Sequence, residues 1–178
     1  MATSYYTASS IDGFVADPEH SLSWLLTRDV DVHGPMGYEG FLERVGALVM
    51  GSSTYRWLLG HLGETGEAWP YALPCWVLTT RQLPAAADSV RFARGDVAEL
   101  HPHLVAAAGD EDVWVVGGGD LAGQFADAGL LDDVWVQYAP VALGAGAPLL
   151  PRRLELRLEE VVRNREFACA RWSVVRGG

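Results

Sequence analysis

The sequence predicts an α/β fold with one mainly parallel sheet, helices on both of its faces and an antiparallel hairpin at its C-terminal edge. Two observations support this prediction. Short apolar runs that end in glycine or small polar residues alternate with helical segments along most of the chain, which is typical of a parallel sheet. After residue 133 the pattern changes to long strand-like segments. No linker separates the two patterns, so residues 1–178 are predicted to form a single domain.

The composition is that of an ordinary globular protein. The 178 residues are 49% hydrophobic and 20% charged, with 20 glycines and 9 prolines, which excludes collagen-like and disordered chains. Thirteen basic residues against 23 acidic ones give a net charge of −10, which repels nucleic acid and anionic membranes. We therefore expect no nucleic-acid partner, although backbone N–H groups could still bind a small anion.

The cysteines and the N-terminal residues bear on the compartment. Cys75 and Cys169 lie far apart and belong to no CxxC motif, so we expect buried thiols in a reducing environment rather than a disulfide scaffold. Residues 1–6 lack the pattern of a signal peptide, and no apolar run approaches the roughly 20 residues that span a bilayer. The prediction is a cytoplasmic protein without a membrane segment.

The first part of the chain contains a long opening segment and one unit of strand, turn and helix. The expected elements are a strand over 3–8, an irregular stretch over 9–36, a short amphipathic helix over 37–44, a strand over 47–50 and a helix from 52 to about 59. Ser52, Ser53 and Thr54 are residue types that begin helices well. An irregular stretch as long as 9–36 is usually functional.

The second part repeats the strand and helix pattern and then ends in a hairpin. The expected elements are strands over 75–78 and 113–116, a helix over 120–129 and strands over 133–141, 154–163 and 166–175. Asn164-Arg165 are placed as the tight turn between the last two strands. The C-terminal edge strand is apolar enough to leave a homodimer open.

The clearest local signal follows the predicted strand at 113–116. Gly117-Gly118-Gly119 would let phosphates approach the backbone, and the helix that begins there supplies N–H donors and a partial positive charge. A tight turn without a ligand explains the same residues equally well. The pattern Gly117-x-Gly119-x-x-Ala122 also fits a dinucleotide fingerprint, but a Rossmann fold needs more strand and helix units than the remaining residues provide.

Three predicted strands end in glycine or small polar residues, namely Gly51-Ser52-Ser53-Thr54, Thr79-Thr80-Arg81 and Gly117-Gly118-Gly119. The carboxyl ends of parallel strands meet at one edge of a sheet, where open α/β folds bind ligands. Separately, each segment is ordinary turn and capping chemistry. Together they favour a long ligand with phosphates, such as a nicotinamide dinucleotide, with the Arg81 guanidinium near a phosphate.

The order of these motifs resembles the dihydrofolate reductases and the related reductase domain of riboflavin biosynthesis. The resemblance covers nearly the whole chain, and its residues are Ser9 to Ala16, Ser23-Trp24, Val49 to Tyr55, Leu78-Thr79-Thr80, Val115 to Leu121, Gly129 to Asp133 and Pro140 to Leu149. It implies a three-layer dihydrofolate reductase-like fold and closest similarity to the C-terminal reductase domain of the bifunctional deaminase-reductase.

The resemblance also implies NADPH as cofactor, which supplies the hydride while the protein supplies orientation and a dry site. The residues implied in cofactor binding are Ala8, Gly51, Ser52, Ser53, Thr54, Leu78, Thr79, Thr80, Arg81, Val116, Gly117, Gly118, Gly119, Asp120 and Leu121. Ala8 and the 10–24 loop would face the nicotinamide, and the 9–36 stretch would act as a lid.

The chain departs from both relatives on the substrate side. Dihydrofolate reductases place an arginine shortly before the third strand, where this chain has Leu73-Pro74-Cys75, so a folate would lose its main anchor. The riboflavin-pathway reductases carry a glutamate before the paired glycines, where this chain has Val116. Ser52 stands where a basic residue often follows the glycine, so NADH is not excluded as the cofactor.

Two carboxylates are candidates for supplying a proton. Asp12 follows the first strand, and Glu39 lies on the short helix, where dihydrofolate reductases carry a carboxylate. Asp12 has a simpler explanation as a turn former and Glu39 as a solvated helix residue. A water held by the site is an equal alternative to either side chain as the proton donor.

Four other side chains are predicted to contact the substrate: Trp24, Tyr38, Phe41 and Gln137. Tryptophans such as Trp24 are more often simply core residues than walls for a planar heterocycle. Gln137 either lines the pocket or finds a backbone partner. No metal site is predicted, because His101-Pro102-His103 has no third ligand nearby and fits a surface loop or a helix start.

Three functions follow from these patterns. The first is an NAD(P)H-dependent reductase that transfers a hydride to a C=N or C=O bond of a small heterocycle, pteridine- or aminopyrimidine-like, with 5-amino-6-(5-phosphoribosylamino)uracil reductase as the implied model. The second is a protein that binds a nucleotide or heterocycle on the same fold without catalysis. The third is a structural domain without a ligand.

Overall fold

The computed structural model describes residues 1–176. Along this part of the chain the elements are β1 (Thr3–Ser10), β2 (Phe14–Ala16), α1 (Ser23–Leu26), α2 (Tyr38–Leu42), β3 (Val45–Gly51), α3 (Ser52–Thr65), β4 (Cys75–Leu78), β5 (Val90–Ala93), α4 (Val97–Ala108), β6 (Asp112–Val116), α5 (Gly119–Asp127), β7 (Asp133–Ala139), β8 (Ala147–Pro148), β9 (Leu156–Asn164) and β10 (Phe167–Val174).

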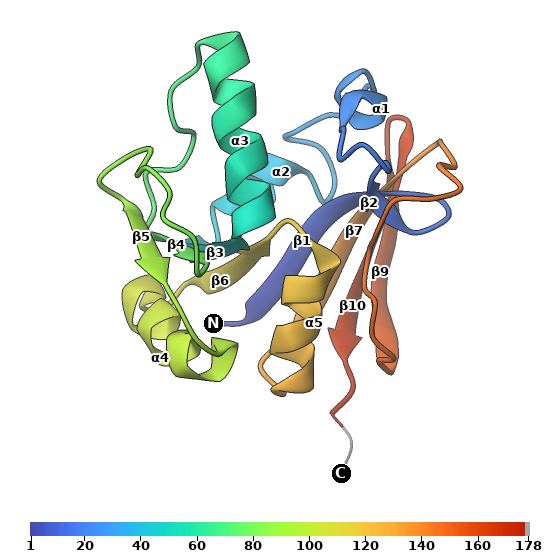
Figure 1. Ribbon diagram of the computed structural model, residues 1–178. Helices are drawn as coiled ribbons and strands as arrows, with labels where there is room; N and C mark the ends of the chain where they lie inside the picture. The colour runs from blue at the N-terminus through green and yellow to red at the C-terminus, as the bar shows by residue number, and fades with distance from the viewer. Residues whose placement is uncertain (177–178) are drawn as a thin grey trace.

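The central sheet has eight strands in the order β5-β4-β3-β6-β1-β7-β10-β9. Neighbouring strands from β5 to β7 pair in parallel, whereas β10 pairs antiparallel with both β7 and β9. Figure 1 shows β5 and β9 near opposite sides of the molecule, with β1 in the middle. The predicted fold class, a mainly parallel sheet with a C-terminal hairpin at its edge, is confirmed.

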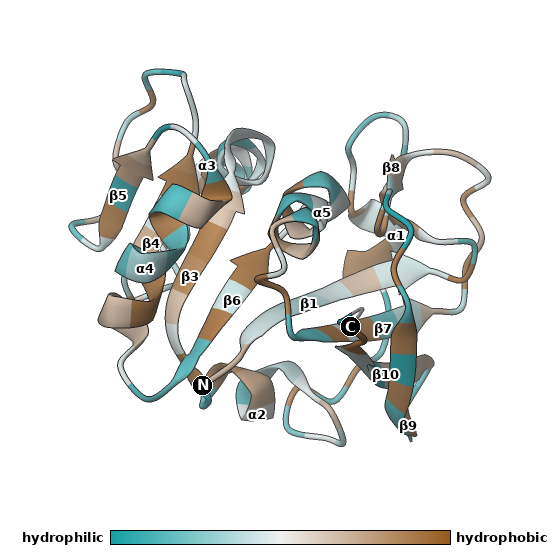
Figure 2. Cartoon of the chain, turned by 90° about the horizontal axis from the view of Figure 1, so that it is seen from below, coloured by the Kyte–Doolittle hydropathy of each residue, from teal (hydrophilic) through white to brown (hydrophobic). Residues whose placement is uncertain are grey.

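The sheet lies between two layers of helices. Side chains of α4 and α5 pack with Tyr5 on one face, and side chains of α2 and α3 pack with Tyr6 on the other. Successive strand residues point to opposite faces, so inner strands that are covered on both sides are typically apolar along most of their length. Figure 2 shows this pattern in the largely brown β3, β4 and β6.

Five elements of the structure were not predicted from the sequence, namely β2, α1, β5, α4 and β8. β5 has only four residues, and two of them, Arg91 and Phe92, are exposed, so it carries little apolar signal. α4 contains Pro102, which removes one helical N–H, and this explains why His101-Pro102-His103 resembled a loop or helix start. The helix forms because Asp96 caps its first turn and its buried side chains recur at helical spacing.

The predicted element boundaries shift by a few residues. Five of the predicted elements are shorter in the structure, which begins α2 at Tyr38, β9 at Leu156 and β10 at Phe167 and ends α5 at Asp127 and β7 at Ala139. β1 and α3 are longer than predicted. The predicted Asn164-Arg165 turn is wrong by one residue, because Asn164 pairs with Phe167 as the last residue of β9, which leaves Arg165 and Glu166 as the turn.

The stretch 9–36 is more ordered than predicted. It contains α1 and β2, and β2 pairs antiparallel with β8. Trp24 and Leu25 of α1 pack against Ala139, Phe167 and Cys169 on the α2 face of the sheet. The expectation of an irregular segment is therefore wrong for these two pieces.

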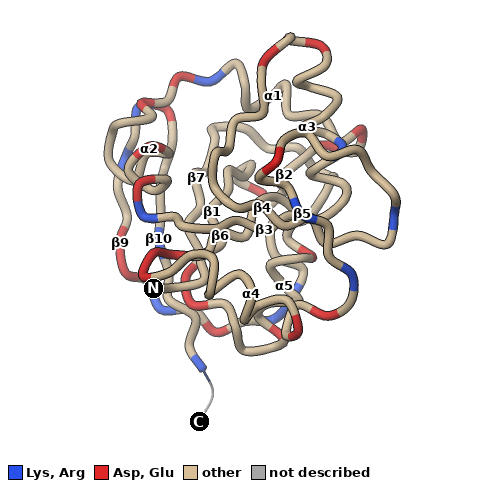
Figure 3. The backbone as a smooth tube through the Cα atoms, turned by 90° about the vertical axis from the view of Figure 1, so that its left-hand side faces the viewer, with Lys and Arg blue, Asp and Glu red and all other residues tan. Residues whose placement is uncertain are grey.

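The thiols and the charges agree with the composition. Cys75 and Cys169 are both free and buried, as predicted. Figure 3 shows acidic residues spread over many loops, with basic positions near β5. Within residues 1–176, no helix is long and apolar enough to cross a bilayer.

Candidate functional site

The structure brings the three predicted strand ends together. β3 lies between β4 and β6, with Gly51 opposite Leu78 and Met50 opposite Val116 in the registers of the two pairs. Because all three strands are parallel, the chain leaves each of them at the same edge of the sheet. The segments that begin α3, follow β4 and begin α5 are therefore neighbours.

The glycine loop after β6 is held by close packing. Gly117 has a φ of +97°, and a Cβ on it would lie 2.1 Å from the Oγ1 of Thr54, so no other residue fits without strain. A Cβ on Gly119 would lie 2.1 Å from the carbonyl oxygen of Leu149. The Tyr5 hydroxyl donates to the carbonyl oxygens of Gly117, at 2.9 Å, and Leu149, at 3.1 Å. These contacts fix the path of the loop.

Gly118, between the two packed glycines, faces open space. A Cβ on it would meet no described heavy atom within 4 Å, and its φ of −69° and ψ of 140° suit any residue. A ligand could therefore approach the backbone at this position, which is the property that a phosphate-binding turn needs.

The two helices that begin at this edge leave their first N–H groups available. In the described chain no side chain caps α3 at Gly51 or α5 at Gly118, whereas the Asp96 carboxylate caps α4 by accepting from the N–H of Ala98 at 2.7 Å. Free N–H groups and the helix dipole both attract anions. Two such ends side by side suit a ligand with more than one phosphate.

A surface pocket of about 270 Å³ lies beside this edge, lined by Ser52, Leu78, Thr79, Thr80, Arg81, Arg94 and Gly95. The Thr79 hydroxyl accepts from the backbone N–H of Arg81 at 3.0 Å and so shapes the turn. Arg94 and Gly95 follow β5 and were not predicted, because β5 itself was missed. The two arginines give the pocket a positive charge suited to a phosphate.

The other predicted cofactor residues divide into backbone and side-chain cases. Val116 and Leu121 are buried in the core, so only their backbone is available to a ligand. The Asp120 carboxylate accepts from Arg152 and Gln124, both at 3.0 Å, and its negative charge is thereby partly neutralised. Ala8 lies on β1 opposite Gln137.

Asp12 is engaged with the loop that follows β7. Its carboxylate accepts from the Ser10 hydroxyl at 2.5 Å and from the backbone N–H groups of Leu143, at 3.0 Å, and Gly144, at 2.6 Å. These bonds, that of Ser10 first, lower the pKa of Asp12 to about 2. A carboxylate that stays ionised and holds a loop is a poor proton donor near neutral pH, so the geometry favours a structural role over the predicted catalytic one.

Aromatic side chains gather on the sheet face between α2 and α3. The Phe41 ring stacks on Tyr6 with centroids 4.4 Å apart, and Tyr38 and Tyr71 each pack edge-on against Trp114, at 5.9 and 5.7 Å. Phe41 is only 3% exposed, so it serves the core more than a ligand. Burial raises the pKa of both Tyr38 and Tyr71.

Tyr71 was not predicted from the sequence. It lies in the segment between α3 and β4, and only the return of this segment over the sheet brings it to Tyr38. Glu39 follows Tyr38 in the first turn of α2. The Tyr38 hydroxyl and the Glu39 carboxylate are therefore carried by α2, and the Tyr71 hydroxyl by the segment before β4.

Two predicted substrate residues have other partners. The Gln137 amide nitrogen donates to the carbonyl oxygen of Met36, and its amide oxygen accepts from the Cys169 thiol at 2.7 Å. The indole N–H of Trp24 donates to the carbonyl oxygen of Ser21 at 3.2 Å, and its ring packs where β7 ends and β10 begins. Of the two alternatives for Gln137, the structure shows the backbone partner.

Over residues 1–176 no three His, Cys, Asp or Glu side chains gather in a way that could hold a metal ion. His101 instead shares a hydrogen bond of 2.9 Å with the Thr3 hydroxyl, and burial lowers its pKa.

Comparison with known families assigns the chain. The family model of the RibD C-terminal domain matches residues 70–169. The chain belongs to the RibD C-terminal domain family. This family includes the predicted reductase relatives of riboflavin biosynthesis, so the suspected resemblance is confirmed.

Individual relatives of this RibD C-terminal domain protein agree in length and fold. The uncharacterised protein YwjB of Bacillus subtilis is 29% identical over 161 residues, which cover 88% of each chain. A solved structure from Shewanella sp. PV-4, provisionally assigned to riboflavin biosynthesis, is 26% identical with a TM-score of 0.82, over 99% of this chain and 100% of that one.

A dihydrofolate reductase from Enterococcus faecalis, solved in complex with NADP(H), shares the fold at 15% identity with a TM-score of 0.61, over 97% of this chain and 96% of that one. The family and these neighbours together support a reductase-like role for the protein.

Proposed function

We propose that the protein is an NADPH-dependent reductase that transfers a hydride to a C=N or C=O bond of a small pteridine- or aminopyrimidine-like heterocycle. The observation that carries this proposal is the pair of uncapped helix ends, α3 and α5, beside a pocket with two arginines. Together they offer several separated sites for phosphate at one edge of the sheet, as a dinucleotide requires.

The residues present fit NADPH. The backbone at Gly118, Gly119 and Asp120 would hold the pyrophosphate, because the Gly118 position is open and the α5 N–H groups are free of side-chain caps. Ser52, Ser53 and Thr54 at the start of α3 would hold the adenosine-side phosphates, and Thr79, Thr80, Arg81 and Arg94 the adenosine end. When bound, NADPH supplies the hydride.

The preference for NADPH over NADH rests on the two arginines of the pocket. Arg81 and Arg94 line the side of the pocket away from α5, next to β4 and β5. The extra phosphate of NADPH sits on its adenosine ribose, and guanidinium groups bind phosphate through charge-assisted hydrogen bonds. NADH would bind the same backbone N–H groups, but it lacks the extra phosphate that Arg81 and Arg94 would contact.

On the substrate side, Tyr38 and Glu39 are the groups best placed to recognise a heterocycle. The hydroxyls of Tyr38 and Tyr71 are hydrogen-bond donors and acceptors, and the surrounding rings provide an apolar wall for a flat molecule. Glu39 is the favoured carboxylate for proton supply, because Asp12 is committed to its loop. A homodimer through the exposed edge strand β9 stays a prediction.

A titration of the purified protein with NADPH and, separately, with NADH tests the proposal, with energy transfer from the 7 tryptophans to the reduced nicotinamide as the signal. We expect saturation at micromolar NADPH and weaker binding of NADH. Absence of a saturable signal with either cofactor would refute the cofactor site. Loss of nicotinamide absorbance with a panel of dihydropteridines and aminopyrimidines then tests catalysis.

A second candidate function is a non-catalytic protein that binds a nucleotide or heterocycle on the same fold. The engagement of Asp12 favours it, because this leaves one carboxylate fewer to supply a proton. Binding of NADPH without consumption across the whole panel would support this second function.

A further inference from the structure

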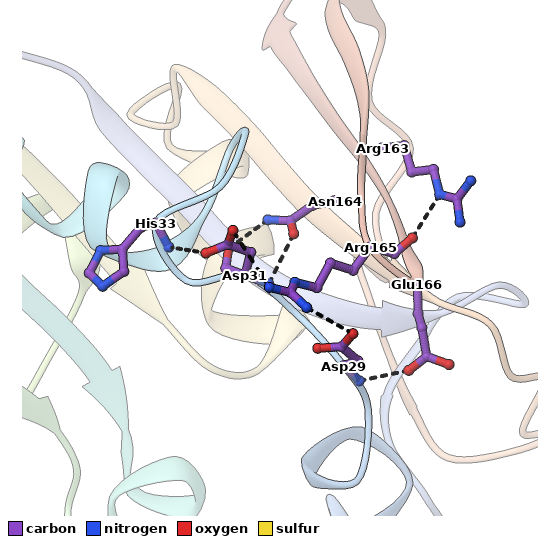
Figure 4. Close-up of polar contacts among 7 residues, drawn as sticks. All are labelled: Asp29, Asp31, His33, Arg163, Asn164, Arg165 and Glu166. Carbon is purple, nitrogen blue, oxygen red and sulfur yellow. Dashed lines mark hydrogen bonds and ion pairs between the residues drawn. The ribbon is translucent and has the colours of Figure 1, made fainter.

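The turn between β9 and β10 is fastened to the segment that leads into α2. Figure 4 shows the side chains of Asn164 and Arg165 reaching toward Asp29 and Asp31, and Glu166 close to Asp29. The N–H of Asp29 donates to the Glu166 carboxylate at 2.6 Å, and the Arg165 guanidinium pairs with the Asp29 carboxylate at 3.2 Å. About 130 residues of chain separate the two partners.

Asn164 makes the buried part of this contact. Its amide oxygen accepts from the N–H of Asp31 at 3.0 Å, and its amide nitrogen donates to the carbonyl oxygens of Asp31, at 2.8 Å, and Pro35, at 3.2 Å. The residue is only 1% exposed. One side chain thus satisfies three backbone groups of the 31–35 segment, in the way that a neighbouring strand would.

The segment held by Asn164 continues directly into α2. The carbonyl oxygen of Val32 accepts from the N–H of Glu39 at 3.0 Å, which supplies a partner for a first-turn donor of a helix whose N-cap residue is glycine. The carbonyl oxygen of Met36 accepts from the Gln137 amide and, at 3.4 Å, from the Tyr6 hydroxyl. A helix of only five residues has little stability of its own, so these contacts determine where it lies.

We propose that Asn164 is a positioning residue for the substrate side of the site: by holding residues 31–35 it sets the position of α2, and with it Tyr38 and Glu39. This inference rests on the proposed function, because α2 matters for substrate only if the heterocycle binds beside it. The C-terminal hairpin is thereby part of the substrate half of the site, although it lies at the opposite edge of the sheet from the cofactor pocket.

The sheet order separates the two halves. The pocket lies at β3, β4 and β5, whereas Asn164 lies on β9, with β6, β1, β7 and β10 in between. A local change at Asn164 should therefore leave the cofactor half unaltered, since distant sites without shared partners behave independently. A general loss of stability would disturb both halves.

Hydrogen–deuterium exchange by mass spectrometry on the full chain tests the inference with Asn164→Ala and Asn164→Asp. The aspartate variant keeps the acceptor for the Asp31 N–H and loses both donated bonds, so it serves if the alanine variant folds poorly. We expect amide exchange over 29–42 to rise by about tenfold or more in both variants, with β3 and β4 unchanged. The near-ultraviolet circular dichroism of the aromatic group should change as well.

Arg165→Asn is the matched control in the same turn. It removes the exposed ion pairs with Asp29 and Asp31, suits the positive φ of 49° and leaves the Asn164 contacts in place, so exchange in α2 should stay at the wild-type rate. Faster exchange confined to 29–35, or a uniform rise over the whole sheet, would overturn the inference.

A separate arm measures NADPH affinity in the wild type and in each variant. We expect the dissociation constants to agree within about twofold, because the described hydrogen-bond partners of Asn164, which are Asp31 and Pro35, do not line the cofactor pocket. If the wild type does not bind NADPH, the proposed function fails while the exchange result still decides the role of Asn164.

Discussion

Substitution of Gly118 by leucine tests the cofactor site with little risk to the fold. The backbone of Gly118, with a φ of −69° and a ψ of 140°, is compatible with leucine, and a Cβ there would meet no described atom within 4 Å. Replacing glycine under these conditions changes the free energy of unfolding by about +0.4 to +1 kcal/mol, through the unfolded chain. The variant should therefore be at least as stable as the wild type.

The effect on NADPH should be large. The leucine side chain would occupy the open space in front of α5, where the phosphates are proposed to contact backbone N–H groups. Loss of two hydrogen bonds to a charged group, each worth about 1.5 kcal/mol or more, corresponds to about 3 kcal/mol in total. At 1.4 kcal/mol for each tenfold change in affinity, the dissociation constant for NADPH should rise by about 100-fold or more.

The assay combines the tryptophan energy-transfer titration with thermal unfolding of the same samples. Gly60→Ala in α3 is a control, because its added Cβ would also meet no described atom within 4 Å and lies away from the loop. Gly117→Ala and Gly119→Ala give the opposite result, since their Cβ atoms would lie 2.1 Å from Thr54 and Leu149 and destabilise the fold. Wild-type NADPH affinity in a folded Gly118→Leu protein would refute the proposed phosphate position.

Three further predictions follow from the charges and thiols. Arg94→Ala and Arg81→Ala should each weaken the binding of NADPH by about tenfold and that of NADH by less, because an exposed guanidinium contributes modestly to phosphate binding. Equal losses of affinity for both cofactors would contradict the preference for NADPH. The control is Arg91→Ala, because the Arg91 guanidinium lies over the Trp76 ring. The pKa of Asp12 is lowered to about 2, first by Ser10, so its loop contact contributes stability above the unfolded pKa of about 4 and loses it as the pH falls toward 2; urea unfolding at several pH values should show this acid dependence in the wild type and less of it in Asp12→Asn, and identical profiles would show that the contact adds nothing. Burial raises the pKa of Cys75 to about 12 and that of Cys169 to about 11, so a disulfide reagent should label neither thiol in the native protein and both after denaturation, whereas rapid native labelling would contradict their burial.

The inner strands could be predicted from the sequence because burial on both faces leaves a mark there. β4 and β6 are short apolar runs, and their predicted positions agree with the structure to within one residue. β5 has only one strand neighbour and two exposed residues, so the same physical rule leaves almost no apolar pattern to read. The Arg94 and Gly95 side of the pocket was missed for this reason.

Other residues were missed because they come together only when segments far apart in the sequence fold against each other. Tyr71 comes near Tyr38 only because the segment before β4 folds back over the sheet. Asn164, beside the turn of the C-terminal hairpin, contacts Asp31, which lies 133 residues earlier in the chain. The alternation and capping rules describe neighbours in sequence or in one element, and they hold no information about such meetings. Asn164 was also hidden by its type, because asparagine beside a short connection suggests a turn rather than a buried strand end.

The central place of β1 has a consequence for biosynthesis. β1 is the first strand to leave the ribosome, yet its two sheet partners are β6 and β7. The N–H of Thr3, at the start of β1, donates to the carboxylate of Asp132, which lies 129 residues later and directly before β7. During translation both hydrogen-bonding edges of β1 therefore stay unpaired while most of the polypeptide emerges. An unpaired strand of this kind can associate with other nascent chains. The many serines and threonines of β1, unusual for a middle strand, keep that waiting segment hydrophilic until its partners arrive.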